Sequence, residues 1–341
     1  MVYVGMDVHR KRTQVAILEE DGTEVLNRNV SNTSGELAGL LAPLGEGTPV
    51  AFEAAYGWSW LADLLEDLRL DAHLAHPSGC RAIAAARLKD DRVDARTLAH
   101  LLRADLLPEA WLAPPEVRDL RALLRHRARL VRLRTALMLR VHAVLAERGI
   151  PSPGTLAAKA TRAEVAALDL PSVASQVVTD CFSLMDALHI PIHRIEAELR
   201  AQAKPDPRVE ALRTLPGVGL LTAMTLVAEI GDITRFPTAR KLCSWAGLTP
   251  RVRNSDRTVR HGHITKQGPQ AVRHVLGEAA HIARRRLPYS RSFAQIAHRR
   301  GKNIAAVAVA RKLLARSFHI LKEVSTEKAS APGELVIGTC A

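Results

Sequence analysis

The first 75 residues alternate short apolar segments with amphipathic ones, and this alternation is the strongest constraint on the fold. Five segments are typical of strands (2–8, 13–18, 24–30, 48–53 and 72–75) and two of helices (34–44 and 58–68). The short connections between the first three strands favour an antiparallel meander. The later strands are separated by helices, which favours parallel pairing. The sequence therefore predicts an α/β layer built on a mixed sheet.

Acidic residues stand where a charge is costly or unusual. Asp7 interrupts the first apolar strand, and Glu53 ends the fourth. Asp91 and Asp94 are three residues apart, so a helix would place both on one face. Asp90 is four residues before Asp94 and would be equally co-facial. Because hard divalent cations bind several carboxylate oxygens, these acids predict a Mg²⁺ site like that with which nucleases of the RNase H type hold a phosphodiester.

The distribution of charge predicts a nucleic-acid partner. The chain has 341 residues, enough for two domains, and a net charge of +13. Residues 235–316 hold fifteen Arg and four Lys against two acids, a net charge of +17, so the remainder carries about −4. A cationic region of this size is typical of proteins that bind DNA or RNA.

The cysteines and the hydropathy exclude other classes. Four cysteines occur at positions 80, 181, 243 and 340, without the spacing of a zinc site or a disulfide framework. We see no signal-peptide pattern and no apolar run of about 18 residues, so we expect a cytoplasmic protein without a membrane partner.

A long helical stretch begins at Pro114-Pro115 and ends at Gly149-Ile150-Pro151. Its apolar residues Leu130, Leu133, Leu137, Val141 and Val144 follow a coiled-coil spacing, and its other faces are rich in arginine. Two interpretations stay open: a helix packed on its own domain, or a dimerisation arm that also grips a phosphate backbone. Residues 173–203 predict a second helix with a kink at Pro191. The expected domains are 1–108, 109–205 and 206–320, followed by a loosely ordered tail at 321–341.

The basic region contains two motifs that favour phosphate binding. Leu215-Pro216-Gly217-Val218-Gly219 resembles the hairpin of a helix-hairpin-helix element, whose backbone N–H groups hold phosphates, although an ordinary corner between two helices has the same pattern. Further on, Ser255 lies in a polar segment rich in arginine, which could bind a phosphate that the serine attacks. The nucleic-acid-binding candidates are Arg251, Arg253, Arg257, Arg260, Lys266, Gly217 and Gly219.

An ordered set of motifs makes a resemblance specific. They are Gly5-Met6-Asp7-Val8-His9, Phe52-Glu53-Ala54, Lys89-Asp90-Asp91-Arg92-Val93-Asp94-Ala95, Leu-Pro-Gly-Val-Gly at 215–219, Gly-Leu-Thr-Pro at 247–250, and Gly-His-Ile-Thr-Lys-Gln-Gly at 262–268. With these motifs in this order, the chain resembles transposases of the insertion sequence 110 family, the DEDD type, from about residue 2 to 290.

The resemblance implies an RNase H-like N-terminal domain similar to the RuvC resolvase, a helical coiled-coil arm and a helical C-terminal transposase domain. It implies a recombinase that cuts and joins DNA through a phosphoserine intermediate, guided by a structured RNA that pairs with donor and target DNA. On this chain Asp7, Glu53, Asp91 and Asp94 would be the metal ligands, which selects Asp91 over Asp90. Ser255 would be the nucleophile, with Ser244 as the alternative because Asp256 stands where the family commonly has Gly.

Two other functions remain compatible with the residues. A metal-dependent nuclease or Holliday-junction resolvase would use the acids and water alone, and a non-catalytic nucleic-acid-binding protein would use neither the acids nor the serine. For the recombinase we expect a homodimer or homotetramer, because the acids and the serine belong to different regions and the helical arm offers a route to assembly.

Overall fold

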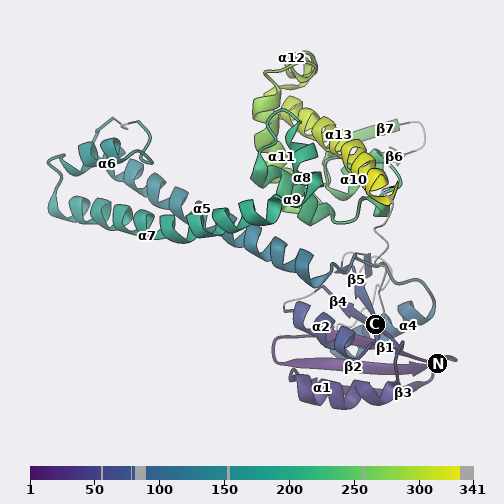
Figure 1. Cartoon of the computed structure of the whole chain (residues 1–341). Coiled ribbons are helices and arrows are strands. Elements are labelled where there is room, and N and C mark those ends of the chain that lie inside the picture. The colour runs from purple at the N-terminus through teal and green to yellow at the C-terminus, as the bar shows by residue number, and fades with distance from the viewer. Residues whose placement is uncertain (55–56, 78, 81–89, 152–153, 256–257, 331–341) are drawn as a thin grey trace, which may run out of the picture. The chain divides into compact units, whose positions relative to one another are not determined.

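The computed structural model describes residues 1–54, 57–77, 79–80, 90–151, 154–255 and 258–330 (Figure 1). The chain divides into two compact units, Met1–Pro115 and Glu116–Ala341. The first unit is a mixed sheet with helices, and the second is mostly helical. This organisation confirms the predicted fold class at that level, whereas the finer division into four segments stays a prediction. No helix in the described part of the chain is both long and apolar enough to cross a membrane.

The five-stranded sheet of the first unit has the order β3-β2-β1-β4-β5. Its strands are β1 (Val2–Val8), β2 (Arg12–Glu19), β3 (Glu24–Ser31), β4 (Pro49–Glu53) and β5 (Asp71–Ala75). The first three strands form the expected antiparallel meander, and β4 pairs parallel to β1 and to β5. This order and direction are consistent with the expected RNase H-like sheet.

Helices cover both faces of this sheet. Every second residue of β1, namely Val4, Met6 and Val8, joins the main core of the unit. The helices on that face are α1 (Ser34–Leu41) and α2 (Ser59–Asp67), which contribute buried leucines to the same core. Because side chains alternate along a strand, the odd residues of β1 face the other way. There they meet α4 (Asp91–Arg103).

The second unit begins with a helical arm (Figure 1). It consists of α5 (Pro115–Ala146), α6 (Lys159–Ala166) and α7 (Ser172–Ala203). The two long helices are antiparallel, since the end of α5 packs against the start of α7, and Leu124 near the start of α5 packs with Ile195 and Leu199 near the end of α7. The predicted ends of both long helices agree with the structure to within a few residues, and Pro191 lies inside α7.

Leu133 of the predicted apolar seam is 55% exposed within the single chain, so the coiled-coil role of this seam stays a prediction. Val141 and Val144 are buried against α7, as the spacing predicted. Toward the middle of the arm, the side of α5 that faces α7 carries Arg127, whose guanidinium donates to Glu196 of α7 at 2.6 Å. An ion pair of a residue outside the predicted seam therefore contributes to the contact between α5 and α7, and Leu133 is exposed.

The remainder of the second unit is a helical domain with one hairpin. Its elements are α8 (Pro207–Arg213), α9 (Leu220–Ile230), η2 (Ile233–Arg235), α10 (Ala239–Trp245), β6 (Pro250–Ser255), β7 (Thr258–Ile264), α11 (Gln270–Ala283), α12 (Tyr289–Arg300) and α13 (Lys302–Ser330). The last helix continues to Ser330, so residues 321–330 are helical where a loosely ordered tail was expected. Its buried residues Phe318, Ile320 and Leu321 pack into the core of the domain, so this packing extends to the start of the expected tail.

Candidate functional site

Asp7 and Glu53 lie side by side in the sheet, on the face that α4 covers. The parallel register pairs Met6 with Phe52, and the next position on each strand is Asp7 and Glu53. Phe52 and Met6 are buried in the opposite core, so the alternation of a strand turns both acids toward α4. Neighbouring strands are about 4.8 Å apart, so Asp7 and Glu53 stand at neighbouring positions of this face.

Gly5 allows α4 to approach this face closely. A Cβ atom at Gly5 would lie 2.0 Å from the carbonyl oxygen of Ala95 and 2.6 Å from the amide nitrogen of Ala99. The backbone of α4 therefore rests directly on β1, and only a glycine on the strand and small residues on the helix permit that distance. This contact brings the first turn of α4 to the end of β1, where Asp7 lies.

The start of α4 separates the roles of Asp90 and Asp91, which the spacing left open. Asp90 has an extended backbone and is the N-cap residue, and its side chain accepts a hydrogen bond from Arg92 N at 3.1 Å. Asp91 is the first residue of the helix and reaches the side chains at the end of β1. The structure thus uses Asp90 to cap the helix and brings Asp91 to the sheet.

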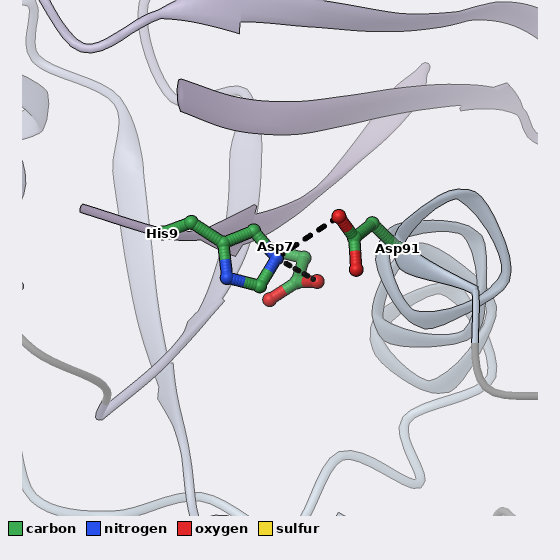
Figure 2. A group of neighbouring side chains, drawn as sticks. All are labelled: Asp7, His9 and Asp91. Carbon is green, nitrogen blue, oxygen red and sulfur yellow. Dashed lines mark ion pairs between the residues drawn. The ribbon is translucent and has the colours of Figure 1, made fainter. Parts of the chain in front are cut away.

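Asp7, His9 and Asp91 form a close cluster (Figure 2). The His9 Nε2 atom lies 3.1 Å from Asp7 Oδ2 and 3.2 Å from Asp91 Oδ2. All three ligand atoms lie within 4.8 Å of one another. The Asp7 side chain is only 15% exposed, whereas Asp91 is half-exposed, so the cluster opens to solvent on the side of the helix.

The electrostatics of this cluster favour a cation. Burial raises the pKa of Asp7, and the nearby charges of Asp91 and Asp94 raise it further, while His9 acts in the opposite direction. The raised pKa means that the folded chain resists a full negative charge at Asp7. A bound cation removes this resistance, because it stabilises the ionised carboxylates together.

The donor set fits a divalent metal ion. Two carboxylates and an imidazole are common ligands of divalent ions. Glu53 and Asp94 do not belong to this group of closely spaced ligand atoms within the described residues, although the backbone places Glu53 beside Asp7 and the charge of Asp94 acts on it.

Two residues that matter at this site were not singled out from the sequence. His9 is part of the Gly5–His9 motif and follows the end of β1 by one residue, so a continued period of two turns it to the same side as Asp7, a signal that the sequence does contain. Gly5 was quoted in the same motif, and nothing in the sequence indicated that a helix some ninety residues later would rest on it.

The predicted nucleophile lies in the hairpin of the second unit. Ser255 ends β6 and pairs with Thr258, the first residue of β7. Arg253 pairs with Arg260 in the same ladder, and for these residues the structure describes the backbone alone. Arg257 lies outside the described residues. Ser244, the alternative, is exposed in the last turn of α10.

Two interlocked loops hold the base of this hairpin. Gly247 precedes β6 and Gly268 follows β7, and both have positive φ angles. A Cβ at Gly247 would lie 2.2 Å from Gln267 O, and one at Gly268 would lie 1.9 Å from Trp245 O. The guanidinium of Arg273 joins the two loops, since its Nη1 donates to the carbonyl oxygens of Ala246 (3.2 Å), Gln267 (2.7 Å) and Gly268 (3.0 Å). These contacts fix the backbone positions at which β6 begins and β7 ends.

The basic candidates near this base are accessible. Arg251 on β6 and Lys266 after β7 are both exposed. The backbone N–H of Lys266 donates to Gly247 O at 3.1 Å, and its φ of 56° belongs to the left-handed region. The side chain of Lys266 is thus presented by a constrained backbone.

The two glycines of the Leu-Pro-Gly-Val-Gly turn have different surroundings. Gly217 has a φ of 81°, and a Cβ there would lie 2.4 Å from Ala279 O, so this glycine allows α11 to pack on the turn. Gly219 is the exposed N-cap residue of α9, with open space around it. Packing thus accounts for Gly217, and a phosphate contact at this turn stays a prediction.

Two family models match the chain. The model described as "Transposase", of the DEDD type of IS110, matches residues 4–149 and includes all four predicted metal ligands. The model described as "Transposase IS116/IS110/IS902 family" matches residues 209–295, which contain the hairpin and its base. The first match thus contains the predicted acids, and the second contains the predicted serine and the basic residues around it.

Curated relatives agree with these models over most of the chain. A probable family 20 transposase of Pseudomonas aeruginosa is 29% identical over 77% of this chain and 80% of its own length. The transposase for insertion sequence element IS1111A of Coxiella burnetii is 29% identical, over 91% of this chain and 86% of its own. The transposase for IS1328 of Yersinia enterocolitica is 27% identical, over 91% and 93%. The chain belongs to the IS116/IS110/IS902 family of transposases, enzymes that cut and rejoin DNA strands.

Proposed function

We propose that this transposase cuts and rejoins DNA with two sets of residues, a metal centre of Asp7, Glu53, Asp91 and Asp94 and a serine nucleophile, Ser255. The observation that carries the proposal is the convergence of acids on one face of the sheet. Asp7 and Glu53 occupy adjacent positions of parallel strands, and the Gly5 contact brings Asp91 into the cluster of Asp7 and His9. Asp94 follows Asp91 by one helical turn and raises the pKa of Asp7.

A divalent cation held by these acids would supply positive charge that orients a DNA phosphate and screens its repulsion from a nucleophile. Such a centre needs its carboxylates to be held near one another by the fold. Burial of Asp7 and the packing of α4 on β1 support this for Asp7 and Asp91, because neither strand nor helix can move away without loss of the core. We expect Mg²⁺ to serve in this role in cells.

The serine step balances without water. The Ser255 Oγ atom attacks a phosphorus atom of DNA, so that an Oγ–P bond forms and a P–O bond to deoxyribose breaks. The leaving deoxyribose oxygen takes up a proton, and the serine hydroxyl gives one up. Rejoining is the reverse reaction with a hydroxyl from another DNA end, which conserves the number of phosphodiester bonds.

The experiment is a denaturing gel of reactions with end-labelled element DNA, a transcript of its non-coding flank and Mg²⁺. A serine intermediate leaves protein covalently attached to labelled DNA, and Ser255→Ala should abolish this adduct while Ser244→Ala keeps it. Asp7→Asn and Glu53→Gln should lower strand cleavage by about 10²–10⁴-fold. Unchanged cleavage in both acid variants would remove the metal centre from the mechanism.

A nuclease that uses the acids alone is the second candidate, and the first unit favours it in one respect. All four acids lie within Met1–Pro115, so a hydrolytic site would be complete in that unit. On the same gel, hydrolysis gives free DNA ends without an adduct, and Ser255→Ala then cleaves like the wild type.

The partners that we propose are donor and target DNA and a structured guide RNA. The net charge of +17 over residues 235–316 supports a polyanionic partner. The register of the hairpin adds to this, because it sets Arg253 opposite Arg260. Like charges at directly opposed positions destabilise a ladder, and a bound polyanion would offset that repulsion. Binding of RNA and of duplex DNA, measured over a range of salt concentrations, should weaken for Arg253→Gln and for Arg251→Gln.

We further propose that the arm joins copies of the chain into a homodimer or homotetramer. Large apolar residues are exposed on both long helices, Leu133 (55%) and Leu139 (62%) on α5 and Leu184 (53%) and Ile190 (74%) on α7. Light scattering after size exclusion should give a smaller mass for Leu139→Glu and Ile190→Glu. Val25→Glu, at an equally exposed residue of β3, is the matched control and should keep the wild-type mass.

A further inference from the structure

His9 completes the acid pair of Asp7 and Asp91 with a nitrogen atom (Figure 2). Its Nε2 atom is 3.1 Å from one carboxylate oxygen and 3.2 Å from the other. Around a divalent ion with bonds of about 2.1 Å, neighbouring ligand atoms are about 3 Å apart. The distances from the imidazole nitrogen to the two carboxylate oxygens are therefore those expected between three ligands of one ion.

The backbone holds His9 in this place. Its N–H donates to Arg12 O at 3.0 Å and closes the turn between β1 and β2. The side chain of Asn32, at the end of β3, donates to the carbonyl oxygen of His9 at 2.5 Å, and the buried Thr13 in turn donates to Asn32. Three strands therefore fix the residue, which is how ligand residues are positioned for a metal ion.

Resting on the proposed metal centre, we propose that His9 is a direct nitrogen ligand of the ion that Asp7 and Asp91 share. Imidazole is a poor ligand for Mg²⁺, which prefers oxygen, and a better one for first-row transition ions. The site accordingly binds a transition ion such as Mn²⁺ or Co²⁺ more tightly than Mg²⁺, and His9 is the residue that sets this preference.

The test uses the purified full-length chain without nucleic acid, with Mn²⁺ as the probe. Pulsed electron paramagnetic resonance of bound Mn²⁺ should detect coupling to a nitrogen nucleus, and labelling of histidine with ¹⁵N should change that signal. His9→Gln should remove the coupling and weaken Mn²⁺ binding by about tenfold or more, with less than about a threefold effect on Mg²⁺. His298→Gln, at an exposed histidine of α12, should behave like the wild type.

The outcomes separate this inference from the metal centre itself. Bound Mn²⁺ without nitrogen coupling, or coupling that persists in His9→Gln, overturns the role of His9 and leaves the carboxylate site standing. Asp7→Asn should lose both ions. Failure of the wild type to bind either Mn²⁺ or Mg²⁺ overturns the metal centre, and the role of His9 with it.

Discussion

Substitution of Gly5 by alanine tests how closely the fold and the metal centre are connected. The new Cβ would lie 2.0 Å from Ala95 O, and ordinary contact begins at 3.4 Å, so α4 must retreat by about 1.4 Å or the strand must bend. A retreat of that size lengthens the contact of 3.2 Å between His9 Nε2 and Asp91 Oδ2 to more than about 4 Å. We expect Gly5→Ala to destabilise the chain by about 1–3 kcal/mol.

The same displacement of α4 should weaken the binding of divalent ions by about 10–100-fold, because the carboxylate oxygens of Asp7 and Asp91 can then no longer bind the same ion. Urea unfolding measures the loss of stability of Gly5→Ala, and calorimetric titration with Mn²⁺ measures its loss of metal affinity. Gly39→Ala is the matched control: this glycine lies in α1 with nothing within 4 Å of the new Cβ, and alanine there should stabilise the helix by about 0.5–1 kcal/mol. Wild-type metal affinity in a folded Gly5→Ala chain would refute the reasoning.

Three further predictions concern other parts of the fold. Glu229→Ala should cost about 3 kcal/mol in urea unfolding, because this buried carboxylate pairs with Arg125 at 2.9 Å and lies beside Arg121; a loss below about 0.5 kcal/mol contradicts this. Gly268→Ala, with its Cβ 1.9 Å from a carbonyl oxygen, should cost about 2 kcal/mol or more and lower DNA cleavage, whereas Gly277→Ala, in open space, should do neither. Burial lowers the pKa of His73, but its hydrogen bonds to two carboxylates outweigh this and raise it. A raised histidine pKa gives stability that is present below about pH 6.5 and is lost as the pH rises through the folded pKa, so amide exchange of β5 should speed up over that range more in the wild type than in His73→Gln.

Much of the first unit could be predicted from the sequence, because its signals are local. Strand alternation and the turns between β1, β2 and β3 follow from a period of two and from short connections, and the observed meander agrees with them. The face on which Asp7 lies follows from the same period. The role of Gly5 could not be predicted, since it depends on where α4 returns to the sheet.

The arm was predicted in extent and only partly in packing. Proline and glycine mark helix ends within one or two turns, so the limits of α5 were readable. Which face of α5 meets α7 depends on pairs between distant residues, such as Arg127 with Glu196, and a heptad count treats an arginine as a surface residue. Likewise, Asp90 and Asp91 are equivalent by spacing, and only the position of the N-cap separates them.

The length of the arm turns a small tilt at one end into a large displacement at the other. Arg121 and Arg125 anchor α5 to the helical domain through Glu229, and the helix continues for 21 residues beyond Arg125 to its end at Ala146. At about 1.5 Å per residue that distance is about 30 Å, so each degree of tilt at the anchor displaces the far end by about half an ångström. A small change of angle where α5 meets the helical domain is thereby magnified at the far end of the arm, and in the proposed assembly a subunit bound there would act back on the contact of Arg121 and Arg125 with Glu229.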